Sequence, residues 1–215
     1  RLLERSDGCG QFGFGVLVHG LGGFQLGQQG GVAGLQELVQ AVALVRQQGV
    51  SIRLRMFNAL HPDTSSTETL HAVMAEISKH SLGQVVEVCS DFLDTDTVDM
   101  EIAKSDLFIN PYQSTGESAS GAVRIGLRNK VPTVVTPLPI FDDLGNAVVR
   151  LPGITPADMA KGIIESLSIL GKPEEAQAWN RRLGDWLETH DFGRQAERLD
   201  GICRTMRINA LLDER

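Results

Sequence analysis

Small polar residues in the middle of the chain have the types and spacing that a phosphate-binding loop needs. An apolar stretch at 106–110 leads into a polar loop, and the run Gly-Glu-Ser-Ala-Ser-Gly at 116–121 follows as the expected start of a helix. A helix that begins with small residues offers free backbone N–H groups and lets a ligand come close. Because open parallel sheets bind ligands beyond the carboxyl ends of their strands, this stretch predicts a phosphorylated ligand at such an edge.

Helical spacing gives the predicted helix a core side and an open side. Glu117, Gly121 and Arg124 fall on the open side, where the arginine could support the charge of a bound diphosphate. The core side consists of small and apolar residues, namely Ala119, Ala122, Val123, Gly126 and Leu127.

Core packing does not require the small residues at the helix start. Ser118, Ser120 and Gly121 are therefore candidates for close contact with a diphosphate. Glu117 has a second interpretation, because its distance from Ser114 is that of a capping box. In that case the glutamate only reaches back to the serine amide, and both interpretations stay open.

Polar residues also follow other predicted strands. Asp142 and Asp143 end a proline-stiffened loop at 137–144 and could orient sugar hydroxyls. They could equally be acids of a first helical turn, favoured by the helix dipole. Asn58 and Asp91–Phe92 come after two further strands, so topology alone puts them at the same edge of the sheet.

The elements that must position these residues alternate between strand and helix six times. Predicted strands lie at 14–18, 51–57, 85–89, 106–110, 132–136 and 148–151, and the helices after them begin at 35, 66, 96, 116 and 156. This alternation predicts right-handed crossovers and a doubly wound parallel sheet, an α/β fold. We expect residues 34–171 to form this Rossmann-like domain.

The two ends of the chain read differently. Residues 1–33 predict an irregular segment around the first strand, because residues 8–34 hold 11 of the 23 glycines. Gly8–Gly13 matches GxGxxG, but a strand rather than a helix follows, so we interpret it as a chance match. Residues 172–215 predict a helical tail. Because Trp179 and Trp186 lie in it, we expect the tail to dock on its own sheet or on a missing domain.

The bulk composition indicates a globular chain of 215 residues with a net charge of -7. Its scattered Lys and Arg residues predict no nucleic-acid partner, which would need a clustered basic face. Three distant cysteines indicate a cytoplasmic location, with peripheral association at the inner face of a membrane left open. The five histidines are not spaced as metal ligands, so we expect no metal and no cofactor. The first residue is Arg1, which leads us to expect a fragment.

The run from Gly116 to Asp143 resembles the C-terminal, donor-binding domain of GT-B-fold retaining glycosyltransferases of the "group 1" class, family four. It is similar to that family's Glu-x7-Glu helix followed by a G-x-P-V-V strand. The stretch at 35–60 is similar to the family's first helix and second strand, and Asp106–Pro111 to the strand before the motif helix. The similarity covers about residues 34–170.

The resemblance implies a nucleotide-sugar donor. Its sugar would lie near Glu117, its diphosphate on the amides of Ser118, Ala119, Ser120 and Gly121, and its nucleoside near Asn58 and Asp91–Phe92. The resemblance also implies hexosyl transfer, with retention, to a glycan or lipid-linked acceptor in polysaccharide or glycolipid assembly. A separate N-terminal Rossmann-like domain would supply the acceptor side.

Two departures from the family pattern keep alternatives open. Ile125 stands where the second Glu usually holds the ribose, and an isoleucine cannot accept hydrogen bonds. The family's basic loop has no clear counterpart, since the first lysine is Lys79, and only His19 and Gly20 stand near its expected start. These departures favour a degenerate binding or scaffold module of the same fold. A nucleotide-sugar epimerase is a further alternative.

Overall fold

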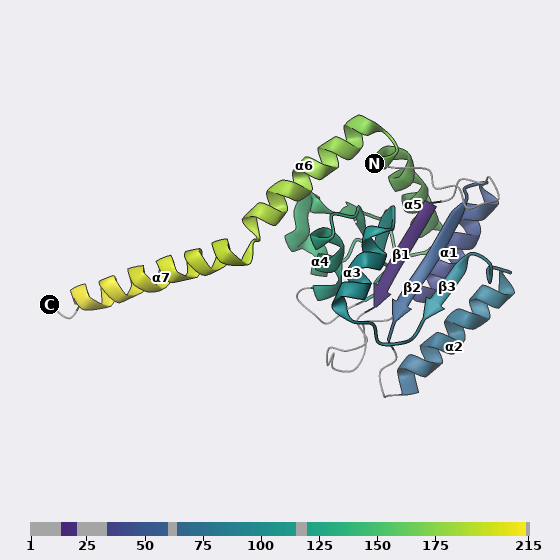
Figure 1. Ribbon diagram of the computed structural model, residues 1–215, viewed down its shortest axis with the longest axis horizontal. Coiled ribbons are helices and arrows are strands. Elements are labelled where there is room, and N and C mark those ends of the chain that lie inside the picture. Colours follow the sequence, from purple (N-terminus) through teal and green to yellow (C-terminus); the bar gives the residue numbers. More distant parts are fainter. Residues whose placement is uncertain (1–13, 21–33, 60–63, 115–119, 214–215) are drawn as a thin grey trace.

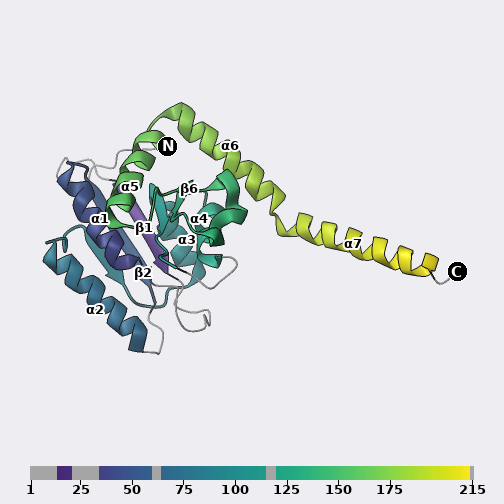
Figure 2. The same cartoon turned by 180° about the vertical axis from the view of Figure 1, so that it is seen from behind.

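The described part of the chain forms one open parallel sheet with helices on both faces (Figure 1, Figure 2). The computed structural model describes residues 14–20, 34–59, 64–114 and 120–213. Its strands lie in the order β3-β2-β1-β4-β5-β6, and every neighbouring pair is parallel. The predicted doubly wound α/β fold is confirmed. The strands are β1 (Phe14–Gly20), β2 (Ile52–Asn58), β3 (Val86–Cys89), β4 (Leu107–Asn110), β5 (Thr133–Val135) and β6 (Val149–Arg150).

Helices of opposite sheet faces bury two separate apolar layers. On one face, α1, α2 and α5 pack over the larger layer, in which Leu38, Val42 and Ile163 are fully buried. On the other face, α3 covers a smaller layer that includes Phe108 and Ile102, and Ile125 of α4 packs at its margin. The buried Val123 and Leu127 of α4 belong to the larger layer. The helices are α1 (Leu35–Gln47), α2 (Thr64–Lys79), α3 (Thr95–Ala103), α4 (Gly121–Arg128) and α5 (Pro156–Leu170).

A glycine lets α4 lie close against the sheet. A Cβ atom added to Gly126 would come within 2.3 Å of Cδ1 of Phe108 on β4 and 2.7 Å of Oγ1 of Thr133 on β5. No larger residue fits there without a shift of its neighbours. Because α4 follows β4 in a crossover to a parallel strand, its first turn lies at the carboxyl edge of the sheet.

Some boundaries differ from those predicted. The helix expected from Gly116 begins only at Gly121, because Ser120 has an extended backbone and serves as its N-cap. In place of the loop expected at 137–144, the chain forms a 3-10 segment, η1 (Pro139–Ala147), which is kinked at Gly145 with a φ of 51°. Strand β1 runs on to Gly20, so His19 lies within the strand instead of after it.

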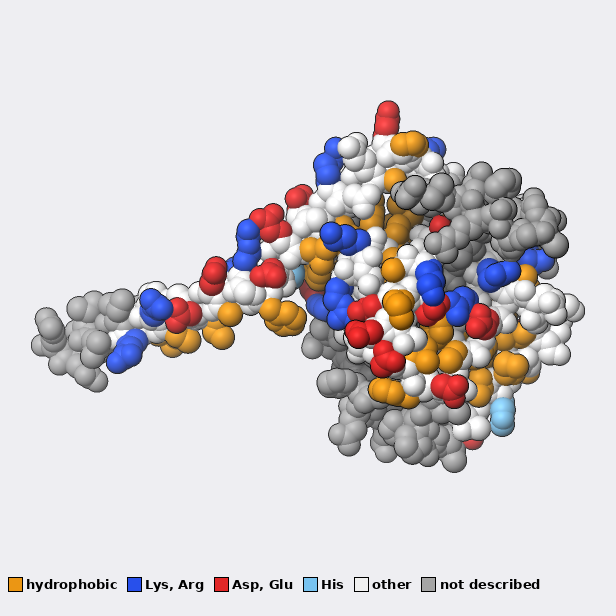
Figure 3. Space-filling model, in the orientation of Figure 1, with side chains coloured by type: hydrophobic (Ala, Val, Ile, Leu, Met, Phe, Trp, Pro, Cys, Tyr) orange, Lys and Arg blue, Asp and Glu red, His pale blue; other side chains and the backbone are white. Residues whose placement is uncertain are grey.

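The tail is helical, as predicted, and its two helices behave differently. In α6 (Pro173–Thr189), Trp179 and Leu183 are buried in the larger core layer, so this helix docks on its own domain. The next helix, α7 (Phe192–Asp213), projects away from the body of the molecule (Figure 1). Figure 3 shows hydrophobic side chains along one side of this projecting helix. Among the side chains of α7 that are described, the large exposed apolar ones are Phe192, Leu199, Ile202 and Met206.

The described residues contain no helix that is a candidate for a membrane span. None of the helices there combines the length and the apolar character that a span requires.

We predict that Gly126→Ala is destabilising, because α4 packs closely against the sheet at this residue. Overpacking against Phe108 and Thr133 costs about 1–3 kcal/mol, and a Cβ as close as 2.3 Å puts the cost above the lower end of that range. The cost then exceeds the roughly 1 kcal/mol that alanine normally gains over glycine in a helix. Gly184→Ala is the matched control, since Gly184 is exposed on α6 and a Cβ there meets nothing within 4 Å. Urea unfolding should show opposite signs for the two variants. Equal stabilisation by both would contradict the close packing of α4.

Candidate functional site

The first turn of α4 is held by a buried cap. The Ser120 side chain is 1% exposed, and its Oγ accepts the Val123 N–H at 3.5 Å. The same Oγ lies 3.3 Å from the hydroxyl of Tyr112 on the preceding loop. The hydroxyl of Ser120 therefore serves the helix, whereas Gly121, the first helical residue, is exposed. Because Gly121 has no side chain, an anion can come close to the backbone N–H groups of this turn.

Arg124 lies beside this turn and is already paired. Its Nη1 donates to the carbonyl oxygen of Ser120 at 2.6 Å, and its Nη2 forms an ion pair with Asp143 on η1. The neighbouring Asp142 forms a second pair, with its Oδ1 3.5 Å from Nη2 of Arg150 at the end of β6. The two acids that the sequence put forward as sugar contacts are thus both neutralised by arginines within the fold.

The other predicted site residues lie farther along the same edge. Asn58 ends β2, which is two strands from β4, and Asp91–Phe92 follow β3, one strand farther. With strands about 4.8 Å apart, these ends lie roughly 10 and 14 Å from the end of β4. The Asn58 Oδ1 is buried and has no partner in the described part of the chain, and Phe92 is 82% exposed. The structure therefore spreads these residues along the edge instead of gathering them around α4.

The loop that carries Asp91–Phe92 ends at a capped helix. The backbone N–H of Thr97 donates to the Asp94 carboxylate at 2.8 Å, and its hydroxyl donates at 2.9 Å. These bonds hold the pKa of Asp94 below its usual value, with the backbone bond as the main cause. Asp94 thus fixes the start of α3 behind the predicted nucleoside contacts.

Part of the predicted site lies outside the described residues. This applies to Glu117, Ser118 and Ala119, and with Glu117 to the capping box that it would form with Ser114. For His19 the structure gives the strand position alone, opposite Phe57 in the parallel pairing of β1 with β2.

Two further polar residues at this edge were missed by the sequence analysis. Asn110 ends β4 and Thr136 follows β5, and both are fully buried. The Asn110 amide nitrogen and oxygen and the Thr136 hydroxyl have no hydrogen-bond partner among the residues described. The signal was available, because each is the polar end of an apolar strand, as Asn58 is.

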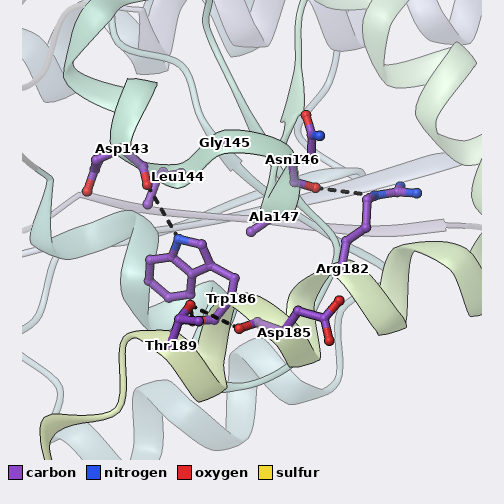
Figure 4. Close-up of a pocket in the computed structure, with 9 residues that line it drawn as sticks. All are labelled: Asp143, Leu144, Gly145, Asn146, Ala147, Arg182, Asp185, Trp186 and Thr189. Atoms are coloured by element: carbon purple, nitrogen blue, oxygen red, sulfur yellow. Dashed lines mark hydrogen bonds between the residues drawn. The ribbon is translucent and has the colours of Figure 1, made fainter. Parts of the chain in front are cut away.

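A shallow hollow of about 320 Å³ lies between η1 and α6, next to Asp143 (Figure 4). The Trp186 indole N–H donates to the carbonyl oxygen of Asp143 at 3.5 Å, and Arg182 Nε donates to that of Asn146 at 3.3 Å. The indole also stacks on His190 with ring centres 4.1 Å apart. These contacts hold α6 against η1, and with it the segment that carries Asp143.

Metal binding has no candidate in the part of the chain that is described. No three His, Cys, Asp or Glu side chains there are grouped so that they could hold an ion.

Comparison with solved structures identifies the fold. A trehalose-phosphate synthase (UDP-forming) from Burkholderia vietnamiensis superposes with a TM-score of 0.70 at 11% identity, over 89% of this chain and 45% of that one. A glycosyltransferase from Rickettsia africae gives 0.67 at 13% identity, over 88% and 47%. Sucrose-phosphate synthase from Thermosynechococcus elongatus gives 0.66 at 10% identity, over 91% and 46%. The chain has the fold of a GT-B glycosyltransferase half.

The GT-B likeness confirms the resemblance seen in the sequence and is a likeness of fold. No protein-family model matches the sequence, and no curated protein matches it either. The chain spans less than half the length of the GT-B structures just named.

The capped loop beside the edge gives a pH-dependent prediction. Because the folded-state pKa of Asp94 lies below its ordinary value of 3.8, the stability it contributes is present above that value and is lost as the pH falls through the lowered pKa. Asp94→Asn keeps a good N-cap that does not titrate. We therefore expect wild type to melt above this variant at about pH 7 and the gap to shrink at about pH 2.5. A gap that stays constant across this range in thermal melts would refute the assignment.

Proposed function

We propose that this chain is the donor-binding half of a retaining hexosyltransferase, which transfers a sugar from a nucleotide sugar to a glycan or lipid-linked acceptor. One observation carries the proposal. The first turn of α4 lies at the carboxyl edge of the sheet, with its cap buried, Gly121 exposed and Arg124 alongside. Backbone N–H groups in that position attract a diphosphate. The fold shared with GT-B glycosyltransferases supports the same function.

In this proposal each residue contacts a different part of the nucleotide-sugar donor. Amides around Ser118, Ala119, Ser120 and Gly121 stabilise the charge that grows on the leaving diphosphate. Glu117 contacts the donor sugar. A nucleoside would extend from the diphosphate along the edge towards Asn58 and the exposed Phe92. The ends of β2 and β3, which carry these residues, lie far enough from the end of β4 to suit an elongated ligand.

The acceptor side belongs to a second half in this proposal. GT-B structures are about twice as long as this chain, which supports a separate N-terminal Rossmann-like domain that binds the acceptor. Polysaccharide or glycolipid assembly in the cytoplasm or at the inner face of a membrane is the setting that we propose. One named neighbour is a trehalose-phosphate synthase described as UDP-forming, which is in keeping with a nucleotide-sugar donor.

We predict that a nucleoside diphosphate raises the melting temperature of this chain. At about ten times its dissociation constant, a ligand that binds only the folded state stabilises it by about 1.4 kcal/mol. For a chain of this size, that corresponds to a shift of roughly 3–5 °C. Thermal denaturation with millimolar UDP, GDP or ADP measures the effect, and no shift with any of the three contradicts the proposal.

Two arginines on α4 provide the control for this measurement. Arg124→Ala removes the cation beside the first turn and leaves Asp143 without its partner, so we expect most of the shift to disappear. Arg128→Ala removes an arginine from the last turn, where it pairs with Asp99, and should keep the shift. Equal losses in the two variants would indicate a general effect of charge instead of a site at the start of α4.

A binding or scaffold module of the same fold is the second candidate. It is favoured by Ile125, which packs against the apolar layer formed by residues such as Phe108 and Val98 and offers no ribose contact. The exposed apolar side of α7 also suits a chain that docks a partner.

Ile125→Glu separates the two candidates. If a donor pocket exists, the new carboxylate can accept hydrogen bonds from ribose hydroxyls, and we expect nucleoside diphosphates to bind about tenfold more tightly. The unliganded variant should melt below wild type, because the carboxylate replaces a packed apolar group. Calorimetric titration of the folded variant measures the affinity, and an unchanged affinity favours the scaffold.

A further inference from the structure

Strand geometry puts the side chain of Asn110 opposite the first turn of α4. Phe108 faces α4, since its ring lies where a Cβ on Gly126 would be. Residues two apart on a strand share a face, so Asn110 faces α4 as well, about 6.6 Å closer to the carboxyl edge. Going back about 6 Å along α4 from Gly126 leads to Ala122, beside the exposed Gly121.

The amide of Asn110 is fully buried there, and the described residues leave it without a partner. Neither its nitrogen nor its oxygen has a hydrogen-bond partner among the described residues. Its backbone is engaged, because the carbonyl oxygen accepts the Thr136 N–H at 3.4 Å. A buried amide without partners costs stability, whereas an apolar residue of the same size would not. A polar side chain in this position is therefore explained best by a group that joins it on binding.

We infer that the Asn110 amide contacts the ligand and binds a pair of neighbouring hydroxyl groups on it. This inference rests on the proposed function, which puts the diphosphate on the adjoining turn of α4. An amide offers one acceptor and one donor side by side, and a vicinal diol offers the complementary pair. A phosphate alone can only accept, so it leaves the amide oxygen unpaired. The ribose and the transferred sugar both carry such hydroxyls.

The test compares Asn110→Leu with wild type by calorimetric titration. Inorganic pyrophosphate, which carries no vicinal diol, should bind both proteins equally through the α4 turn. UDP-glucose should bind the variant about tenfold more weakly, because two hydrogen bonds at a buried amide are lost, and UDP should do so as well if the ribose is the partner. A loss already seen with UDP assigns the ribose, and one confined to UDP-glucose assigns the transferred sugar. Either result supports the inference.

Thr136→Val is the matched control. It also removes a fully buried hydroxyl without a described partner. Thr133 faces α4, so alternation turns Thr136 to the other face of the sheet. Both affinities should stay unchanged in this variant.

Unliganded melting temperatures decide whether Asn110 is structural. The ligand role predicts that Asn110→Leu melts at or above wild type. A melting temperature below that of wild type overturns the inference. So does a loss of affinity for pyrophosphate in Asn110→Leu, and so does an unchanged affinity for both UDP and UDP-glucose. If wild type itself binds none of the probes, the proposed function fails and the inference fails with it. If wild type binds and the variant is unchanged, only the inference fails.

Discussion

The packing of α4 on the centre of the sheet is the constraint on which the candidate site depends. Gly126 lets the helix backbone rest against Phe108 and Thr133, so α4 can occupy only one height above β4 and β5. That height fixes the first turn at the carboxyl edge, four to five residues back along the helix. Ser120 then caps the helix from a buried position, and Gly121 is left at the surface. Helix, cap and edge therefore form one rigid unit.

On the face of β4 that α4 covers, an apolar residue that packs in the core is followed by a polar residue that could bind a ligand. Phe108 belongs to the smaller apolar layer under α3, and Ile125 of α4 packs at the margin of that layer. Two residues later the same face carries a buried amide in place of a hydrophobic side chain. The apolar layer keeps water away from below, and hydrogen bonds are stronger where water is excluded. At this edge a buried amide therefore lies beside an exposed helix terminus.

Much of this architecture could be predicted from the sequence because it depends on local patterns. Apolar periodicity located the six strands and the starts of α1, α2, α3 and α5 to within two residues. The 3-10 segment η1 was expected as a loop. The start of α4 was misplaced by five residues, because small polar residues suit a helix start and a loop equally well. The pairing of Arg124 with Asp143 could not be predicted, nor could the Asn110 amide that has no partner among the described residues. Both depend on which segments meet in space, and a single sequence does not show that.

The charges near the first turn of α4 limit how tightly this edge can bind a diphosphate. Arg124 and Arg150 are each balanced by an aspartate of η1, so the described charges next to the first turn of α4 sum to about zero. The chain as a whole carries a net charge of -7, which does not draw an anion towards it. Attraction for a diphosphate must then come mainly from the helix terminus, whose dipole supplies about half a charge at short range. A terminus of this strength holds a diphosphate weakly by itself, and sugar hydroxyls or a basic group from outside the described residues must supply the remaining affinity.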